Sequence, residues 1–346
     1  MANRKTAEQI KEEILSILKE GPLSIEQLRK KIESNWSTIN SYLEELSKSG
    51  NVKKIISADK KKIYQRVFGD TYFDIPITDL ERKKFRTLFS LIMKKYKEKD
   101  KTPTKTELAK AAVKVINSQS SGLAELPTVW YLYGMIPLMI ADPSQNYSEE
   151  IQLEHTPKIN SIIEIYIQES HEKKSRQLQR EQHREYNDAL YCLSDSFLDE
   201  VQKPNWDKEK IFDILNDFFI ACPIDNDFQE VFWLTDRFIS TVRKLSCFDK
   251  LENNKIKILL TFDALWKFIA TYKFYKTLSA QKRFLGKENL VNLYLGNALS
   301  LRKACAQEAI SDLYSVYWSK LDNRELKELP QTEKIKAIMA GWTGED

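Results

Sequence analysis

Three clusters of basic side chains near the start of the chain could bind phosphates. The clusters are Arg29, Lys30 and Lys31, then Lys53 and Lys54, and then Lys60, Lys61 and Lys62 with Arg66. Lysine and arginine neutralise the phosphates of nucleic acids, which makes such binding strongly dependent on salt. The net charge is only +4, yet the first 69 residues hold 14 basic against 9 acidic side chains, while the remainder is nearly balanced. A run of like charges is also common on a solvated surface, but here three clusters fall in the one basic part of the chain.

A polar segment between the first two clusters could contact the edges of DNA bases. Its candidate residues are Trp36, Ser37, Thr38, Asn40 and Ser41. The amide of Asn40 can form two hydrogen bonds with adenine and is the strongest single candidate; the alternative is that it only faces solvent. The segment has no Lys or Arg before Lys48 and carries Glu44 and Glu45, which argues against direct base readout.

Motifs of the common enzyme classes do not occur in the sequence. GxxxxGK[ST], GxGxxG, HExxH and GxSxG are all missing. His155, His171 and His183 lie far apart in the chain, without Cys or His at the short spacing that metal sites use. We therefore expect no catalysis, no cofactor and no bound metal.

The elements that carry these residues are predicted by the pattern of residues 6–68, which indicates three helices and a β-hairpin. TAEQIKEEILSILKEG has apolar residues at helical spacing and ends in glycine. Ser24 and Gln27 form the capping box of a second helix, SIEQLRKKI. Asn35 caps a third helix, and Gly50 supplies the left-handed position that ends it. The β-rich stretches NVKKII and KKIYQRV then predict an antiparallel hairpin.

Residues Thr6 to Phe68 resemble the winged helix-turn-helix domains of archaeal and bacterial regulators of the ArsR and MarR type. The resemblance is carried by the stretches PLSIEQLRKKI, NWSTINSYLEELSKSGNV and IYQRV. The resemblance implies that the third helix enters the major groove, where residues 36–41 meet base edges. It also implies that the second helix and the hairpin contact phosphates. Some winged helices instead dock proteins or dimerise, so the fold is specified more firmly than the function.

Beyond residue 69 the pattern is almost entirely helical, and we expect two further domains, residues 70–145 and 146–346. In the first, a long amphipathic helix over residues 77–100 should place five apolar side chains inward: Leu80, Phe85, Leu88, Leu91 and Ile92. A helix over residues 102–116 has the pattern of the second helix of another helix-turn-helix. The apolar stretch Leu126 to Ala141 contains Pro137 and is interpreted as a buried segment rather than a membrane span.

Residues 146–346 predict a helical bundle or a repeat-like stack. Residues 160–201 contain one long helix or two, and the further helices are expected at 206–221, 227–245, 255–285, 287–317 and 332–340. Within this region, residues 265–284 interleave aromatic residues with lysines. Such a string is used to stack single-stranded nucleic acid, but an amphipathic helix with an aromatic inner face has the same pattern, and we favour the latter.

Composition and cysteine usage set the class of the protein. With 42% hydrophobic and 30% charged residues but only 9 Gly and 10 Pro, the chain is expected to be mainly α. Four cysteines are widely spaced without a CxxC, which favours a reducing, cytoplasmic location. No apolar run is long enough to cross a membrane, so no membrane partner is expected.

Two functions follow as hypotheses. In the first, the winged helix binds double-stranded DNA as a transcriptional regulator, and the helical remainder serves dimerisation, effector sensing or partner docking. In the second, the winged helix docks protein and the helical region is a scaffold in a replication, chromatin or defence complex. The partners considered are therefore duplex DNA, a homodimer, and a protein bound through the helical C-terminal region.

Overall fold

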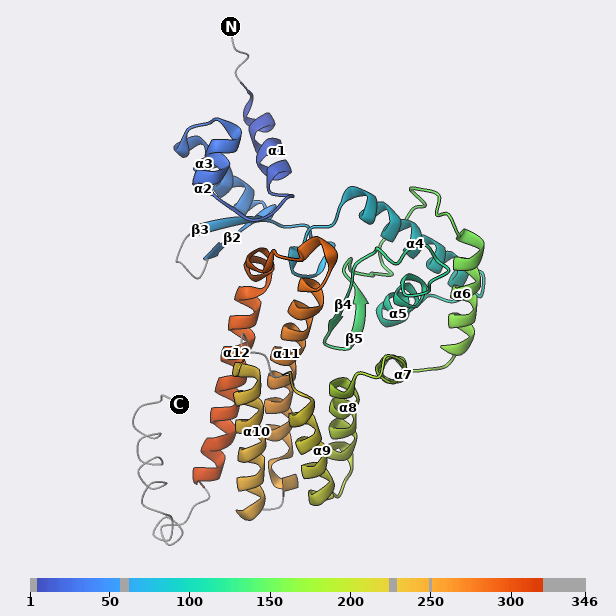
Figure 1. The fold of residues 1–346 in the computed structure, drawn as a ribbon, viewed down its shortest axis with the longest axis vertical. Coiled ribbons are helices and arrows are strands. Elements are labelled where there is room, and N and C mark those ends of the chain that lie inside the picture. The colour runs from blue at the N-terminus through green and yellow to red at the C-terminus, as the bar shows by residue number, and fades with distance from the viewer. Residues whose placement is uncertain (1–4, 57–61, 224–228, 249–250, 320–346) are drawn as a thin grey trace. The chain divides into compact units, whose positions relative to one another are not determined.

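The computed structural model describes residues 5–56, 62–223, 229–248 and 251–319 (Figure 1). It is mainly helical, as the composition predicts. Contacts divide the chain into two compact units, one of Met1–Gln179 with Lys273–Asn297 and one of Arg180–Tyr272 with Ala298–Asp346.

The N-terminal part of the first unit is a winged helix. Its elements are α1 (Ala7–Ile17), β1 (Leu23–Ser24), α2 (Ile25–Ile32), α3 (Trp36–Lys48), β2 (Val52–Ile56) and β3 (Lys62–Arg66). The three strands form an antiparallel sheet in the order β1-β3-β2. Both the helix order and the hairpin of the predicted fold are confirmed.

Local sequence explains where the helices of this domain begin and end. The hydroxyl of Ser24 accepts a hydrogen bond from the backbone N–H of Gln27, whose side chain bonds back to the Ser24 N–H, so the predicted capping box is present. The side chain of Asn35 accepts from the N–H of Thr38 at the start of α3. At the other end of α3, Gly50 has a φ of +74°, a conformation that glycine adopts without strain. Residues such as Ile14, Leu28, Ile39 and Leu43, all 0% exposed, form the core between the helices.

The rest of the first unit is only partly as expected. Its elements are the short 3₁₀ helix η1 (Tyr72–Asp74), α4 (Asp79–Lys97), α5 (Lys105–Ile116), β4 (Thr128–Tyr131), β5 (Gly134–Pro137) and α6 (Thr156–Glu169). Four of the five apolar residues expected inward on α4 are buried, but Leu80, in its first turn, is 57% exposed. A second helix-turn-helix would need a recognition helix soon after α5, but residues 117–127 contain no helix. The apolar stretch 126–141 is largely buried, as predicted. It contains a β-hairpin, although the sequence pattern beyond residue 69 indicated almost only helices.

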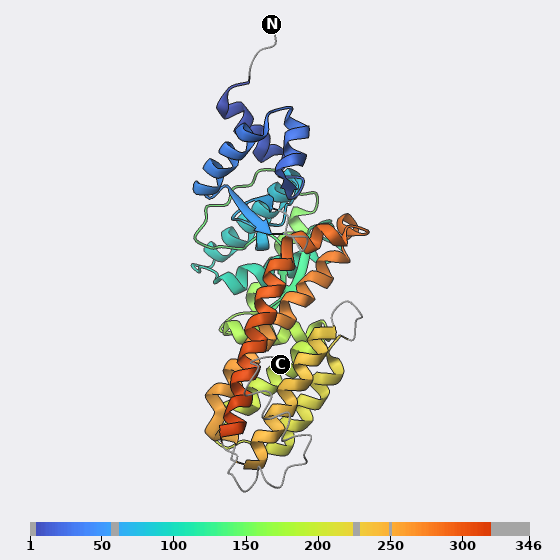
Figure 2. The ribbon, with the colours of Figure 1, turned by 90° about the vertical axis from the view of Figure 1, so that its left-hand side faces the viewer.

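The second unit is a helical bundle. It contains the end of α7 (Ser175–Glu185), then α8 (Ala189–Gln202), α9 (Lys208–Ala221) and α10 (Gln229–Phe248), and it shares α11 (Lys255–Ser279) and α12 (Glu288–Ser319) with the first unit. Figures 1 and 2 both show α8, α9 and α10 side by side. Their core is aromatic: the ring centres of Phe197, Phe218 and Phe238 lie 4.4, 5.7 and 6.0 Å from that of Phe262 on α11.

Two sequence-based boundaries differ from the structure. Residues 160–201 hold parts of three helices rather than one or two, because the chain turns at Glu172 and Asn187, which both have left-handed backbones. The compact units also cross the expected division at residue 145, since residues 146–179 and 273–297 belong with the N-terminal part. The helix expected over 332–340 lies outside the described residues.

Candidate nucleic-acid interface

The helix-turn-helix is formed by α2, a short turn and α3. Glu33 ends α2 with a left-handed backbone, φ 56°, and its N–H bonds to the Arg29 carbonyl. Asn35 then caps α3, and the Ser37 hydroxyl donates to the Asn35 side chain over 2.9 Å. With Ile39, Leu43 and Leu46 held in the core, the opposite side of α3 is directed outward.

The outward side of α3 contains the five residues predicted to contact bases. Trp36 is 50% exposed, Ser37 and Ser41 are exposed, and Thr38 and Asn40 are half-buried. The Nδ2 atom of Asn40 donates to Glu44 Oε1 over 3.1 Å, so Asn40 is bonded within the helix rather than only solvated. The structure therefore brings the predicted set together on one surface and adds Glu44 to it.

The basic end of α2 is at the surface, in weak ion pairs. Arg29 Nε lies 3.2 Å from a carboxylate oxygen of Glu26, and Lys31 Nζ lies 3.4 Å from one of Glu20. Lys30 is exposed. Ion pairs between exposed side chains contribute little to stability, so these cations can exchange their partners for phosphates at small cost.

Two lysines of the hairpin are exposed and share one face of the sheet. Lys54 is paired with Tyr64 across the strands, and Lys62 is paired with Ile56, so the alternation of strand residues puts Lys54, Lys62 and Tyr64 on the same face. Tyr64 is 5% exposed and belongs to the core of the winged helix. Strand β2 contacts α3. The two lysines thus lie on the sheet face that meets the helices; Lys60 and Lys61 lie outside the described residues.

Two other predicted phosphate ligands are engaged in internal contacts. Lys53 Nζ lies 2.6 Å from Asp74 Oδ2, on the opposite face of the hairpin from Lys54. Arg66 donates from Nη1 to the Leu15 carbonyl over 2.9 Å and lies over the ring of Phe68, and burial lowers the pKa of its guanidinium. Both side chains therefore already have partners within the domain, and their assignment to phosphates stays a prediction.

The back of the hairpin is covered by the segment that follows it. Gln65, 1% exposed, donates from Nε2 to the carbonyls of Phe73 and Asp74 over 3.2 and 3.1 Å. The Asp74 carboxylate accepts from the backbone N–H groups of Phe68 and Gly69. Sequence reasoning missed Asp74 because it lies 21 residues from Lys53 and no local pattern relates them. These contacts cover the back of the hairpin, whereas Lys54 and Lys62 on its other face stay exposed beside the helices.

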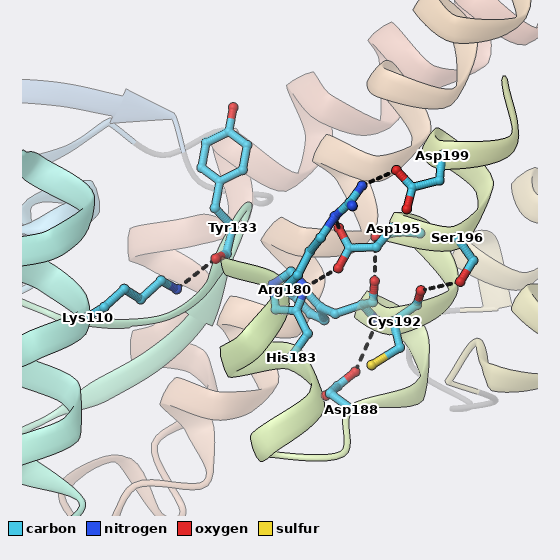
Figure 3. Close-up of polar contacts among 11 residues, drawn as sticks. Lys110, Tyr133, Arg180, His183, Asp188, Cys192, Asp195, Ser196 and Asp199 are labelled. Carbon is cyan, nitrogen blue, oxygen red and sulfur yellow. Dashed lines mark hydrogen bonds and ion pairs between the residues drawn. The ribbon is translucent and has the colours of Figure 1, made fainter. Parts of the chain in front are cut away.

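The other residues that could bind nucleic acid or take part in catalysis are buried or partly buried within the fold. The aromatic residues of 265–284 are buried, Trp266 at 9% and Phe274 at 0% exposed, so they belong to the core rather than to a stacking platform. The helix is buried on most of its sides, not along the one apolar face of the amphipathic helix that the sequence pattern indicated. In the second unit, His183 Nδ1 lies 2.6 Å from Asp195 Oδ2, and the His183 side chain is only 4% exposed (Figure 3). Burial raises the pKa of the nearby Cys192 thiol, which disfavours the nucleophilic thiolate.

A buried lysine in the first unit also belongs to the fold. Lys110 of α5, 5% exposed, donates from Nζ to the Tyr133 carbonyl over 2.8 Å (Figure 3). It also donates to the Met135 carbonyl over 3.2 Å, and the two bonds fasten the β4–β5 hairpin to α5. Burial lowers its pKa from 10.5 to about 7.

Comparisons with protein-family models, curated proteins and solved structures found no match to this chain. Within the described part, no group of three or more His, Cys, Asp or Glu side chains is placed to hold a metal ion. No described helix has both the length and the apolar character that crossing a bilayer requires.

Proposed function

We propose that the N-terminal winged helix binds double-stranded DNA and that the protein acts as a transcriptional regulator. The observation that carries the proposal is the arrangement of α3 and the hairpin. The outward side of α3 is uncovered by the described chain, the adjoining sheet face bears exposed Lys54 and Lys62, and the opposite sheet face is covered by η1.

The proposed division of labour follows from the charges. Lys30 at the end of α2 and Lys54 and Lys62 on the hairpin neutralise phosphates on either side of a groove. The uncharged residues of α3 then face the bases between them. Because phosphate contacts release condensed counterions, affinity should fall steeply with salt.

An electrophoretic shift of a duplex by the full-length protein, repeated over a salt series, tests this proposal. Replacing both Lys54 and Lys62 by Ala should weaken binding and reduce the slope of log affinity against log salt by about 1.8. The matched control replaces both Lys97 and Lys101, which are exposed at the end of α4, by Ala. It should leave the slope of log affinity against log salt unchanged. No shift with the unmodified protein at low salt, or equal effects of the two double variants, would contradict the proposal.

A second candidate function is favoured by Trp36 and Glu44. An exposed Trp and a carboxylate two turns further along a helix with no cation before Lys48 also suit a protein-docking surface, where Trp is enriched and basic charge is not required. Under this alternative the protein is an assembly module. It predicts that size-exclusion chromatography detects a hetero-complex that Trp36→Ala abolishes, and that added duplex DNA does not co-elute.

A further inference from the structure

Glu44 is an exposed negative charge on the surface proposed to face DNA. It lies on the third turn of α3, at i+4 from Asn40 and i+8 from Trp36, so the three share one stripe of the helix. The pKa of Tyr64 on β3 is raised by burial and, to a smaller extent, by the charge of Glu44. Among the described residues no Lys or Arg forms an ion pair with it.

The neighbouring Glu45 is in a different situation. Lys11 Nζ lies 2.8 Å from Glu45 Oε2, and the same ammonium lies 3.1 Å from Glu8 and 5.6 Å from the centre of the Tyr42 ring. Glu45 is therefore paired with a lysine of α1, whereas within the part of the chain that the structure describes Glu44 is bonded only by the amide of Asn40. Two adjacent residues of the same type thus offer a direct comparison.

A carboxylate that approaches DNA is repelled by the phosphates and by most base edges. In the major groove guanine presents the acceptors N7 and O6, and thymine presents the acceptor O4, none of which can donate to a carboxylate. Adenine presents its N6 amino group beside the acceptor N7. Cytosine presents its N4 amino group without an acceptor, and this group is the usual partner of Glu at a base edge. Because the Asn40 amide already donates to Glu44, the pair presents acceptor oxygens outward at a fixed position.

We infer that Glu44, oriented by Asn40, makes this interface selective for a cytosine in the major groove. The inference rests on the proposed DNA binding and adds its specificity: phosphate contacts give affinity, and one carboxylate rejects bases whose major-groove edge presents an acceptor. It also accounts for a recognition helix that has a Glu where a cation would strengthen binding to any sequence.

Selection of bound duplexes from a randomised library by the full-length protein, followed by affinity measurements, tests the inference. Selected sites should share a cytosine at one position, and its replacement by thymine should weaken binding roughly 5- to 150-fold. Glu44→Ala should remove this discrimination, and Glu44→Gln, which keeps the side-chain volume, provides a second variant if folding is affected. Glu45→Ala loses the same charge at the adjacent position and should keep the cytosine preference.

The outcomes separate this inference from the proposed function. Retention of the cytosine preference in Glu44→Ala, or a selected adenine at that position, overturns the inference while DNA binding stands. Selected sites that share no cytosine also overturn the inference and leave DNA binding intact. Failure of the unmodified protein to retain any duplex overturns both.

Discussion

Lys53 and Lys54 are adjacent in the sequence but have different surroundings, because neighbouring strand residues point to opposite faces. Lys53 Nζ is bound by Asp74 at 2.6 Å, while Lys54 is exposed on the face that meets the helices. Sequence alone predicted that both would bind phosphate, because charge is visible in a sequence and partners are not. The same limit applied to Arg66, whose acceptor is the Leu15 carbonyl, 51 residues away.

These two lysines give a prediction at the level of single residues. Lys53→Ala should lower the free energy of unfolding by about 1 kcal/mol, since it breaks a partly buried ion pair, and should leave the salt dependence of DNA binding unchanged. Lys54→Ala should leave stability unchanged within about 0.5 kcal/mol and reduce the salt slope by about 0.9. Urea unfolding and a salt series of binding titrations measure the two quantities. Interchanged effects would show that Lys53 is the phosphate ligand.

Lys110 gives a prediction about pH. Its pKa is about 7 in the folded protein against 10.5 ordinarily, so between these values the unfolded chain binds a proton that the folded chain does not. The penalty for burying the charge is complete below pH 7 and disappears as the pH approaches 10.5. The free energy of unfolding should therefore rise with pH, by about 2 kcal/mol from pH 7 to pH 9 for this group.

Urea unfolding of the natural chain and of Lys110→Met at both pH values isolates this contribution. Met keeps the length of the side chain and does not titrate, so the difference between the two proteins removes the effect of other groups. Cys222 is one such group, because burial raises its pKa to about 11. Equal pH dependence in both proteins would show that Lys110 does not lose its proton in this range.

Among the elements, the helices were the most predictable and the β4–β5 hairpin the least. Capping boxes at Ser24, Thr78 and Thr104 and the regular apolar spacing mark helices through local interactions. The strands Thr128–Tyr131 and Gly134–Pro137 lie in an apolar stretch without the polar alternation of a half-exposed strand, so their period is hidden. The covering of the winged-helix sheet by η1 was also not predictable, because it depends on packing beyond the domain boundary.

The attachment of the hairpin to η1 gives a prediction for an element. Asp74 has a φ of 54°, and its carboxylate accepts two backbone N–H bonds and the Lys53 ammonium. Asp74→Ala should lower the free energy of unfolding by about 2 kcal/mol and speed hydrogen exchange of the β2–β3 amides. Asp74→Asn, which tolerates the left-handed backbone and keeps an acceptor oxygen, should be intermediate. Equal stability of all three proteins would contradict the role given to this carboxylate.

In the whole molecule, the first unit is completed by a distant part of the chain. The ring of Phe274 on α11 lies 5.0 Å from that of Phe73 and 5.4 Å from that of Tyr131. Gln281 donates to the Thr128 carbonyl over 2.9 Å, and Arg283 lies 3.2 Å from a carboxylate oxygen of Glu81. Composition and charge could not reveal a unit assembled from two separate segments, which is why the expected boundary at residue 145 differs from the structure.

This organisation predicts that residues 1–179 do not keep the stability of the first unit when produced alone. Without α11 and the start of α12, Phe73 and Tyr131 lose the buried partner Phe274, and β4–β5 amides should exchange faster than in the full chain. In the full chain, Phe274→Ala should lower the free energy of unfolding by about 3–5 kcal/mol. A fragment whose hairpin exchanges as slowly as in the full chain would show that residues 273–297 are dispensable.

Hydrogen exchange of the full-length protein with and without an excess of random-sequence duplex, at low salt, tests the central proposal most directly. Amides of α3 and of the β2–β3 hairpin should exchange more slowly when DNA is present, while those of η1 and of the bundle formed by α8, α9 and α10 should not change. Two results would contradict the assignment of the winged helix as a DNA-binding surface. One is protection located in that bundle, and the other is no protection anywhere in an excess of duplex at low salt.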